Sequence, residues 1–380
     1  MAGIVASRTM PTMLPAPSLF ATALSSNRPA QSSLEATHPV PHLVLPFASS
    51  SDEACRALLP TLALPNLTRL LALANPPHSL PPTPANAAPG DAPNASDFDP
   101  ELTLTPPHEW VLAQVLGLVD VTTADLAALD GRLPWAAAMS RPLLASPDTP
   151  AAWFSPCHQE VGTGQVTLHP PATLGLSDAH SQALMAALQP LALEDGIRLH
   201  WVAADRWLAQ GQVFASLPSA SLDRVAGRSI AGWLSSGPAA AGLRRLQSEA
   251  QMLYYNHPAN DQREAQRLAP VNAFWISGSG ACPSGARHAA PELVVPQTLR
   301  TAALQGHWTG WQQAWQTLDA EVLPAWLNHA QRGQPLRITL CGERSSLSFD
   351  LTPRSAWQGI RQKISSFFTT LRLTELLKQL

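Results

Sequence analysis

The sequence predicts an α/β fold with a mainly parallel or mixed sheet and helices on both faces. Short apolar runs of strand length alternate with longer segments whose apolar residues recur every three or four positions. Alternation of this kind is typical of layered α/β proteins. With 380 residues, the chain can also bury a sizeable core. We therefore expect one α/β domain over residues 39–351 and a C-terminal helix within residues 352–380.

The expected strands are short and apolar, and turn residues bound them. The first is the run from His42 to Phe47. The segment from Trp153 to His158 is rich in aromatic residues and contains Pro156, so we expect it to be irregular. Further strands are expected at 165–168, 197–202, 206–208 (as a strand or a turn), 271–276, 336–341 and 347–351.

The expected helices carry apolar stripes and recognisable ends. Ser51 or Asp52 caps a short helix that Pro60 breaks, and Pro107 begins a helix that Gly117 ends. A stripe of tryptophans predicts a long helix over residues 308–326. Further helical segments are expected at 67–73, 125–129, 177–188, 243–255, 260–270 and 357–377.

Composition excludes several classes of partner. Charged residues make up only 13% of the chain and the net charge is −3, so bulk charge attracts neither nucleic acid nor an anionic membrane. No run of about 18 or more apolar residues occurs, so we expect no membrane span. The 4 cysteines are far apart and form no CxxC pair, which predicts the reducing cytoplasm. Cys157 and His158 are adjacent, which is a poor spacing for binding one metal ion. We expect no metal and no cofactor in this protein.

Two segments have little potential to form a core. Residues 1–38 are rich in Ala, Ser and Pro, and we expect a disordered extension. Such an extension fits a start codon placed too early, with Met10 or Met13 available downstream. Residues 75–100 are dominated by Pro, Ala, Asn and Asp, which predicts a loop within the domain.

The most polar stretch runs from Leu243 to Pro283. Its concentration of hydrogen-bonding side chains predicts either a ligand site or a buried polar network. Arginine can hold a phosphate or carboxylate with two hydrogen bonds, and glycine lets backbone amides approach the same group. The candidate ligands for a small anionic metabolite are Arg244, Arg245, Asn260, Arg263, Asn272, Gly278, Ser279 and Gly280.

His257 and Asp261 are the candidate catalytic residues, as a general acid or base. Structural alternatives stand beside them. Asp261 can cap a helix, a histidine before a proline can be purely structural, and Arg245 can form a surface ion pair with Glu249. The glycine-rich run 278–280 follows an expected strand, where α/β proteins often bind ligands, but it lacks the full dinucleotide fingerprint.

Several segments between about residue 42 and residue 351 carry a family resemblance. They are LPFASS, LPNLTRLL, TPPHEWVLAQVLGL, DGRLPWAA, SPCHQEVG, EDGIRL, SLDRVAGR, LRRLQSEAQMLYYNHPANDQREAQRLAPVNAFWISGSG and LRITLCGE. Together they resemble the RpfE-type regulatory-protein family of proteobacteria, whose members are often labelled cofactor-independent phosphoglycerate mutase. The resemblance implies an alkaline-phosphatase/phosphoglycerate-mutase-like fold.

The chain departs from the metal-ligand pattern that this resemblance implies. Two-metal phosphoryl transfer needs several carboxylates and histidines gathered at strand ends. In such enzymes the first strand ends in a metal-binding Asp, whereas here it ends in Pro46-Phe47-Ala48-Ser49. The strand before the second metal cluster ends in Thr-Asp, whereas here it continues Leu340-Cys-Gly-Glu-Arg-Ser345.

We therefore expect a non-catalytic or regulatory protein on a phosphoglycerate-mutase-like scaffold, binding a small anionic ligand, with unknown protein partners. The alternative is an active phosphoglycerate mutase, or a related phosphotransferase or phosphatase, with relocated ligands. Candidates for those ligands are Glu343, Asp223 and His257. A further alternative is a metal-independent enzyme in which His257 or Asp261 is the general base.

Overall fold

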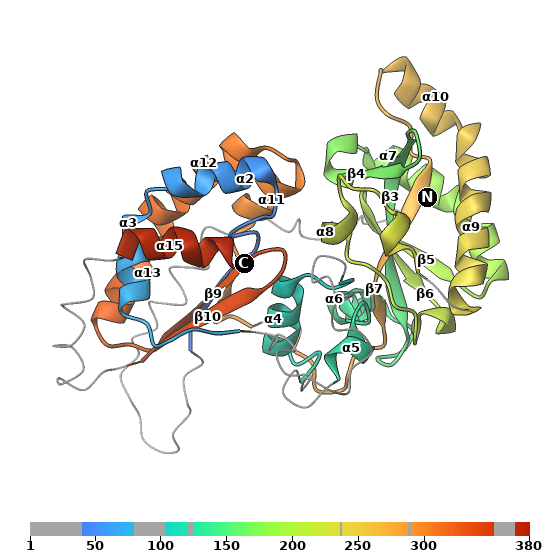
Figure 1. The fold of residues 1–380 in the computed structure, drawn as a ribbon. Helices are drawn as coiled ribbons and strands as arrows, with labels where there is room; N and C mark the ends of the chain where they lie inside the picture. The colour runs from blue at the N-terminus through green and yellow to red at the C-terminus, as the bar shows by residue number, and fades with distance from the viewer. Residues whose placement is uncertain (1–39, 80–102, 121–124, 236–237, 288–289, 353–368) are drawn as a thin grey trace, which may run out of the picture.

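The computed structural model describes residues 40–79, 103–120, 125–235, 238–287, 290–352 and 369–380. Its strands form two sheets, and each sheet has its own helices (Figure 1). The expected extension over residues 1–38, most of the 75–100 loop and the first part of the C-terminal segment lie outside the described residues. Among the helices that are described, none is long and apolar enough to cross a membrane.

The first sheet is mixed, as predicted. Its strand order is β2-β10-β9-β1-β8. β1 runs parallel to both β8 and β9, whereas β10 runs antiparallel to β9 and β2. The strands are β1 (His42–Leu45), β2 (His78–Ser79), β8 (Leu293–Val294), β9 (Leu336–Cys341) and β10 (Ser346–Leu351).

Helices cover both faces of this sheet. On one face, Leu43 and Leu45 of β1 and alternate residues of β9 and β10 are buried against six helices. On the other face, Val44 of β1 lies in a small apolar cluster with Val111 of α4 (Pro107–Val115). The six helices are α2 (Glu53–Leu58), α3 (Pro65–Ala72), α11 (Thr298–Leu304), α12 (Trp308–Thr317), α13 (Leu323–Gln331) and α15 (Thr369–Lys378).

The long helix expected over residues 308–326 is interrupted. α12 begins at Trp308, but a π-helical turn, Leu318–Val322, separates it from α13. Pro324 is the cause, because proline in a helix interior lacks the amide hydrogen and its ring clashes with the preceding turn. Asp319 lies in this π-helical turn and is buried. Its carboxylate accepts from the amides of Asn66 and Leu67, at 3.2 and 2.8 Å, and so caps α3.

The second sheet is antiparallel throughout, unlike the parallel strands that alternation suggests. β5 and β6 are joined by residues 204–205 alone, and a parallel crossover needs about a dozen residues or more. The strand order is β4-β3-β6-β5, with β7 paired to β3. The strands are β3 (Ala151–Val161), β4 (Val166–His169), β5 (Arg198–Ala203), β6 (Arg206–Gln210) and β7 (Ala273–Gly280).

The expectation that residues 153–158 are irregular is wrong, because β3 runs through them. Pro156 lies opposite Phe274 of β7, in register with the rest of the ladder. On the other edge, pairing with β6 stops at Phe154. Adjacent residues of a strand direct their hydrogen bonds to opposite edges, and the Cys157 carbonyl accepts from Asn272 beside β7. The missing amide of Pro156 therefore faces the edge where no ladder continues.

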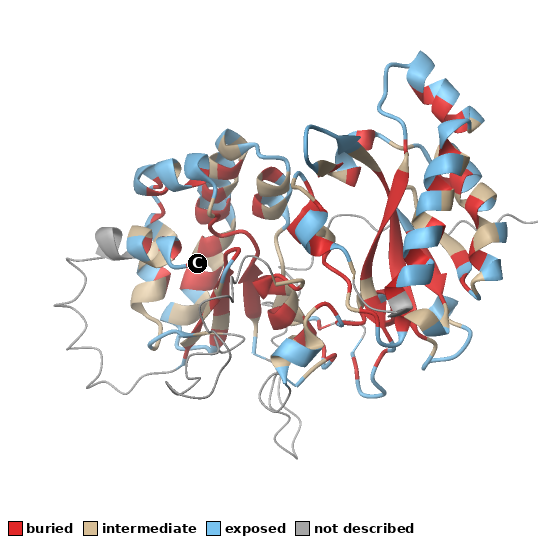
Figure 2. Ribbon diagram, turned by 45° about the vertical axis from the view of Figure 1, so that its right-hand side comes forward, coloured by how far each residue is buried: buried red, intermediate tan, exposed pale blue. Residues whose placement is uncertain are grey.

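Helices also cover both faces of the second sheet. α7 (Asp178–Glu194) and α9 (Pro238–Tyr255) bury one face, while α4, α6 (Trp135–Met139) and α8 (Leu222–Val225) lie on the other. Figure 2 shows the strands buried between helices whose outer surfaces are exposed. α4 belongs to both cores, because its Trp110 and Ala113 pack on the second sheet while Val111 packs on the first. Two further α-helices of the described residues are α5 (Leu126–Leu129) and α10 (Pro258–Ala265).

Replacement of Asp319 tests the cap on α3. We expect Asp319→Ala to lower the free energy of unfolding by about 1–2 kcal/mol, because it exposes helix amides that the carboxylate now satisfies. Glu321→Ala in the same π-helical turn is the control, since Glu321 is exposed. Urea unfolding followed by circular dichroism measures both. Equal losses in the two variants would show that the cap contributes nothing specific.

Candidate functional site

Two asparagines of the polar stretch bind backbone groups and act as structural links. Asn260 Nδ2 donates to the carbonyls of Tyr254 and Val271, each at 2.8 Å, and Asn260 Oδ1 accepts from the Val271 amide at 2.9 Å. Asn272 makes the same kind of double contact with the backbone of Gln159 in β3, accepting at 2.8 Å and donating at 2.9 Å. Asn260 therefore ties α10 to the chain entering β7, and Asn272 ties that chain to β3.

Arg263 is fully buried and is also committed to backbone carbonyls. Its Nε donates to Ala269 O at 2.9 Å and its Nη2 donates to Leu174 O at 2.6 Å. A buried charge that donates in this way locks separate segments together. Leu174 lies before α7 and Ala269 lies after α10, so Arg263 joins two parts of the second sheet's helical layer.

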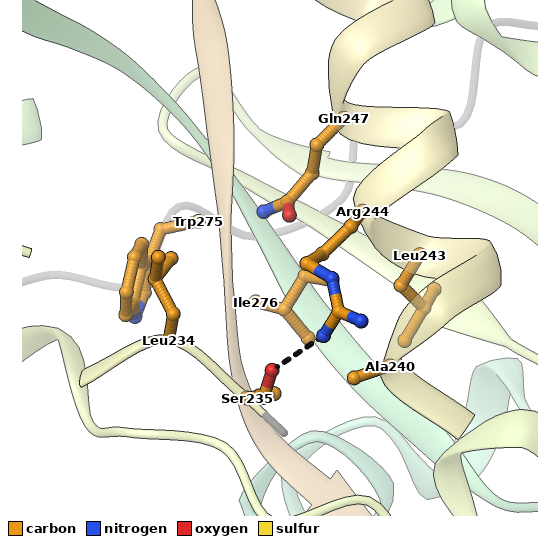
Figure 3. A pocket seen from close by; sticks show the side chains of 8 residues that line it. All are labelled: Leu234, Ser235, Ala240, Leu243, Arg244, Gln247, Trp275 and Ile276. Atoms are coloured by element: carbon orange, nitrogen blue, oxygen red, sulfur yellow. Dashed lines mark hydrogen bonds between the residues drawn. The ribbon is translucent and has the colours of Figure 1, made fainter. Parts of the chain in front are cut away.

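Arg244 and Arg245 lie on the exposed side of α9. Arg244 Nη1 donates to Ser235 O at 3.0 Å, and Arg245 forms an ion pair with Asp195 after α7. Arg244 also lines a small hollow with Leu243 and Gln247 of the same helix (Figure 3). The volume of this hollow is about 20 Å³, which is room for a single water molecule rather than a metabolite.

The candidate catalytic residues lie at the start of α10. His257 Nδ1 accepts from the Ala259 amide at 3.1 Å, so the imidazole caps a helix whose first residue is Pro258. The expectation that this helix starts near Asn260 with Asp261 as its cap is wrong, because proline is well tolerated in a first turn. Burial lowers the pKa of His257, against a smaller opposing effect of Asp261. Asp261 is exposed.

The glycine run 278–280 is part of β7 rather than a turn. The register between β3 and β7 shifts here, and Gly278 takes a left-handed φ of 63°. A Cβ on Gly278 would lie 2.9 Å from Cβ of Trp135, so glycine allows α6 to approach the strand. Ser279 is buried, and its hydroxyl donates to Leu217 O at 2.5 Å and contacts Ser219 Oγ at 2.7 Å.

The structure therefore separates the predicted ligand residues. Asn272 immediately precedes β7 and Gly280 ends it, and eight residues of strand extend about 26 Å. Arg263 contacts the chain near the first of these ends, whereas Ser279 lies near the second. Of the two interpretations that the sequence left open, these contacts favour a buried polar network.

A different group of polar side chains gathers where the two sheets meet. It lies at the carboxyl ends of the parallel strands β1 and β9, which is where open α/β sheets usually bind ligands. α4 and α8 face these strand ends from the side of the second sheet (Figure 1). We call this group the junction cluster; its members are Ser50, Ser51, His108, Glu109, Ser221, Asp223, Arg224, Arg228, Arg300 and Glu343.

Glu343, just after β9, is the carboxylate at these strand ends. It is buried, and Ser50 Oγ, the Ser51 amide and Ser51 Oγ donate to its Oε2 at 3.0, 2.8 and 2.7 Å. Its other oxygen accepts from Arg228. Burial alone would raise the pKa of Glu343, but Arg228 and the Ser50 and Ser51 donors lower it below its ordinary value.

Asp223 of α8 is the second buried carboxylate. Arg300 of α11 holds it bidentately, with Nε at 2.6 Å from Oδ2 and Nη2 on Oδ1. His108 Nε2 of α4 lies 3.1 Å from the same Oδ2. Burial would raise the pKa of Asp223, but Arg300 and His108 together hold it well below its ordinary value.

Glu109 is the third carboxylate. Its Oε1 accepts from Ser221 Oγ, and its Oε2 accepts from Trp135 Nε1 at 3.2 Å. Burial and the nearby Asp223 raise the pKa of Glu109. The surroundings therefore disfavour the ionised form of Glu109, whereas they favour the ionised forms of Asp223 and Glu343.

Arg224 connects the cluster to the surrounding backbone. Its Nη1 donates to Glu343 O at 2.7 Å, and its Nη2 donates to Thr103 Oγ1 at 2.6 Å and Thr105 O at 3.2 Å. Burial lowers the pKa of Arg224 to about 10, so the guanidinium keeps its charge at neutral pH.

The end of β1 beside the cluster is strained. Phe47 takes a φ of 54°, a left-handed conformation that is uncommon for a bulky residue and recurs at functional sites. Trp311 Nε1 donates to Phe47 O at 2.8 Å, and Trp315 Nε1 donates to Ala48 O at 3.3 Å. The Phe47 ring lies 5.7 Å from the His108 ring, so the strained turn directly abuts the junction cluster.

Sequence reasoning placed Asp223 and Glu343 only among alternative ligands and did not select His108, Glu109, Arg224, Arg228 or Arg300. The cluster spans residues 50–343, so no local concentration of polar residues marks it. One usable signal was the adjacent His108 and Glu109 at the start of a mainly apolar helix. Another was Ser221-Leu-Asp-Arg224, with two charges in a single helical turn.

Comparisons with known proteins do not assign the chain to a family. No protein-family model matches the chain, and neither does any curated protein. The cofactor-independent phosphoglycerate mutase from Thermoplasma acidophilum is 12% identical, with a TM-score of 0.35, over 90% of this chain and 99% of that one. The PH0037 protein from Pyrococcus horikoshii is 11% identical, with a TM-score of 0.41, over 82% and 87%. Similarity this distant says nothing about chemistry, and membership of the RpfE-type family stays a prediction.

Replacement of Arg263 tests the structural interpretation of the polar stretch. We expect Arg263→Ala to lower the free energy of unfolding by about 1.5–3 kcal/mol, because two buried carbonyls lose a charged donor. Arg69→Ala, at an exposed arginine of α3, is the control and should change stability by no more than about 0.5 kcal/mol. Chemical denaturation measures both, and an Arg263→Ala protein as stable as the control would contradict the network.

Replacement of Glu343 should make stability less dependent on pH. A carboxyl whose folded pKa is depressed stabilises the fold above its unfolded pKa, near 4.5, and loses this effect as the pH falls through the folded pKa. We expect Glu343→Gln to cost about 1.5–3 kcal/mol near neutral pH, and the difference from wild type to shrink below pH 4.5. Urea titrations across this range test it, with Glu321→Gln as the exposed control. A difference that is constant with pH would rule out the ionised Glu343 as its source.

Proposed function

We propose that this chain is a non-catalytic regulatory protein on a phosphoglycerate-mutase-like α/β scaffold. The observation that carries the proposal is that both carboxylate oxygens of Glu343 already accept hydrogen bonds from the protein. Glu343 is the carboxylate at the carboxyl ends of β1 and β9, and four donors from Ser50, Ser51 and Arg228 already bind its two oxygens. A carboxylate held in this way serves the fold, whereas phosphoryl-transfer centres need carboxylates that are turned toward metal ions.

The alternative of relocated metal ligands has less support. His257 caps α10, and α10 packs with α7 beside the second sheet, away from β9 (Figure 1). Asp223 and Glu343 are held in separate ion pairs, with Arg300 and Arg228 respectively. The three residues proposed for that alternative therefore do not form one centre.

A small anionic metabolite is better accommodated by the rim of the junction cluster than by the 244–280 stretch. The side chains of Arg228 and Arg300 are 37% and 33% exposed, respectively. Arginine has five N–H donors, and the contacts to Glu343 and Asp223 use one on Arg228 and two on Arg300. Both guanidiniums therefore retain donors for a phosphate ester or a carboxylate, which would then bind between the two sheets and influence their arrangement.

The proposal predicts binding without turnover. Purified protein should not interconvert 2- and 3-phosphoglycerate or hydrolyse p-nitrophenyl phosphate, with Mg²⁺, Mn²⁺ or Zn²⁺ present. 3-Phosphoglycerate should raise the melting temperature, and Arg228→Gln should weaken its affinity about ten- to hundredfold by removing charge-assisted hydrogen bonds. Arg244→Gln is the matched control, because Arg244 is an exposed arginine outside the junction cluster.

The outcomes separate the candidates. Turnover in the wild type that disappears in Glu343→Gln would overturn the non-catalytic proposal. A thermal shift that Arg244→Gln removes and Arg228→Gln retains would return the anion site to the 244–280 stretch. Absence of any shift with 3-phosphoglycerate or inorganic phosphate would remove the anionic ligand from the proposal.

A further inference from the structure

Three potential metal ligands meet inside the junction cluster. His108 and Glu109 come from the first turn of α4, and Asp223 comes from α8. One ligand atom of each residue lies within 4.8 Å of the others. His108 and Asp223 are buried, with exposed fractions of 4% and 6%, so solvent does not separate the three groups.

Two of the three carboxylates in the junction cluster have an arginine partner among the described residues, and the third does not. Asp223 is paired with Arg300, and Glu343 is paired with Arg228. Glu109 receives its direct hydrogen bonds from the neutral groups of Ser221 and Trp135. Glu109, which is partly exposed, is therefore the one carboxylate of the three to which no arginine of the described residues is bound.

The imidazole of His108 supplies a second, independent observation. Its Nδ1 is buried and has no hydrogen-bond partner within the part of the chain that the structure describes. Buried ring nitrogens are normally satisfied, so an unmatched one in a ring that contacts Asp223 indicates a missing partner. A ring flip brings either nitrogen of His108 to the side of Asp223, and a neutral imidazole offers a lone pair on one of them.

The existing contacts of the two carboxylates do not prevent coordination. Each carboxylate oxygen has two lone-pair directions, so an oxygen that accepts one hydrogen bond can still bind a cation. Donors such as Arg300 on Asp223 and Trp135 on Glu109 are the outer partners that typically orient metal ligands. The Arg300 side chain that holds Asp223 is partly exposed, so the group lies near the surface.

We propose that His108, Glu109 and Asp223 bind one divalent transition-metal ion, which ties α4 to α8 at the junction of the two sheets. One imidazole nitrogen with two carboxylate oxygens suits Zn²⁺ or Mn²⁺ better than Ca²⁺ or Mg²⁺, which favour sites made of oxygen alone. The ion supplies the positive charge that Glu109 lacks. It is a single ion at a site separate from Glu343, so it does not restore a two-metal phosphoryl-transfer centre.

The competing explanation is that a proton on His108 balances the cluster. An imidazolium between Asp223 and Glu109 would neutralise the site without any metal ion. The two explanations differ in what Zn²⁺ should do to the protein. An ion replaces that proton and binds in stoichiometric amount, whereas an imidazolium would repel it.

Calorimetric titration of the EDTA-treated full-length chain with ZnCl₂ tests the proposal. We expect one equivalent to bind and the melting temperature to rise. Glu109→Gln should weaken the affinity about a hundredfold, while its amide oxygen can still accept from Trp135 and its NH2 group can donate to Ser221 Oγ. His169→Ala is the control, because the rings of His158 in β3 and His169 in β4 are partly exposed, lie 5.2 Å apart and form the obvious adventitious site.

Each result decides the matter. One equivalent retained in His169→Ala and weakened in Glu109→Gln supports the site. Failure of the wild type to bind Zn²⁺ or Mn²⁺, or binding that His169→Ala abolishes and Glu109→Gln leaves intact, overturns it. If Glu109→Gln does not fold, anomalous diffraction from wild-type crystals soaked in ZnCl₂ locates the ion directly, and a peak anywhere other than between His108, Glu109 and Asp223 rejects the proposal.

Discussion

Burial of carboxylates between the two sheets is the constraint on which the arrangement of this molecule depends. Removing an ionised carboxylate from water costs several kcal/mol, and only a well-placed cation and hydrogen bonds offset that cost. Asp223 and Arg300 are 77 residues apart in the sequence, and Arg228 and Glu343 are 115 apart. To bring these partners together, α8, α11 and the end of β9 must occupy one relative position. These charge pairs therefore help to specify how the two sheets meet, together with the apolar contacts that α4 makes with both sheets.

Much of the fold could be predicted because local sequence governs it. Leu243, Leu246 and Ala250 recur at helical spacing and form the buried stripe of α9. His42–Leu45 is a buried strand because both faces of its sheet are covered by helices. The errors arose where a distant partner overrides local pattern. Pro156 is accepted in β3 because the pairing with β6 has already ended, and no feature of the surrounding residues reveals that.

The site was harder to predict for a related reason. The polar stretch from Leu243 to Pro283 was selected because its hydrogen-bonding residues are neighbours in the sequence. Residues such as Asn260 and Arg263 use that closeness to satisfy nearby backbone groups, which is how local polar clusters often serve a fold. The residues of the junction cluster, in contrast, come from parts of the chain that are far apart in the sequence. His108, Asp223 and Glu343 are widely separated in the chain, and only the pairing of β1 with β9 and the placement of α4 and α8 bring them together.

The membership of α4 in two cores has a consequence for how the protein unfolds. Val111 completes an apolar cluster on the first sheet, while Trp110 and Ala113 complete one on the second. A helix cannot leave one of these clusters and remain seated in the other, because its side chains move as a rigid unit. Loss of either sheet therefore exposes apolar surface on its neighbour and destabilises it as well. We therefore expect the two sheets to unfold in a single cooperative transition and the amide hydrogens of α4 to be among the slowest to exchange.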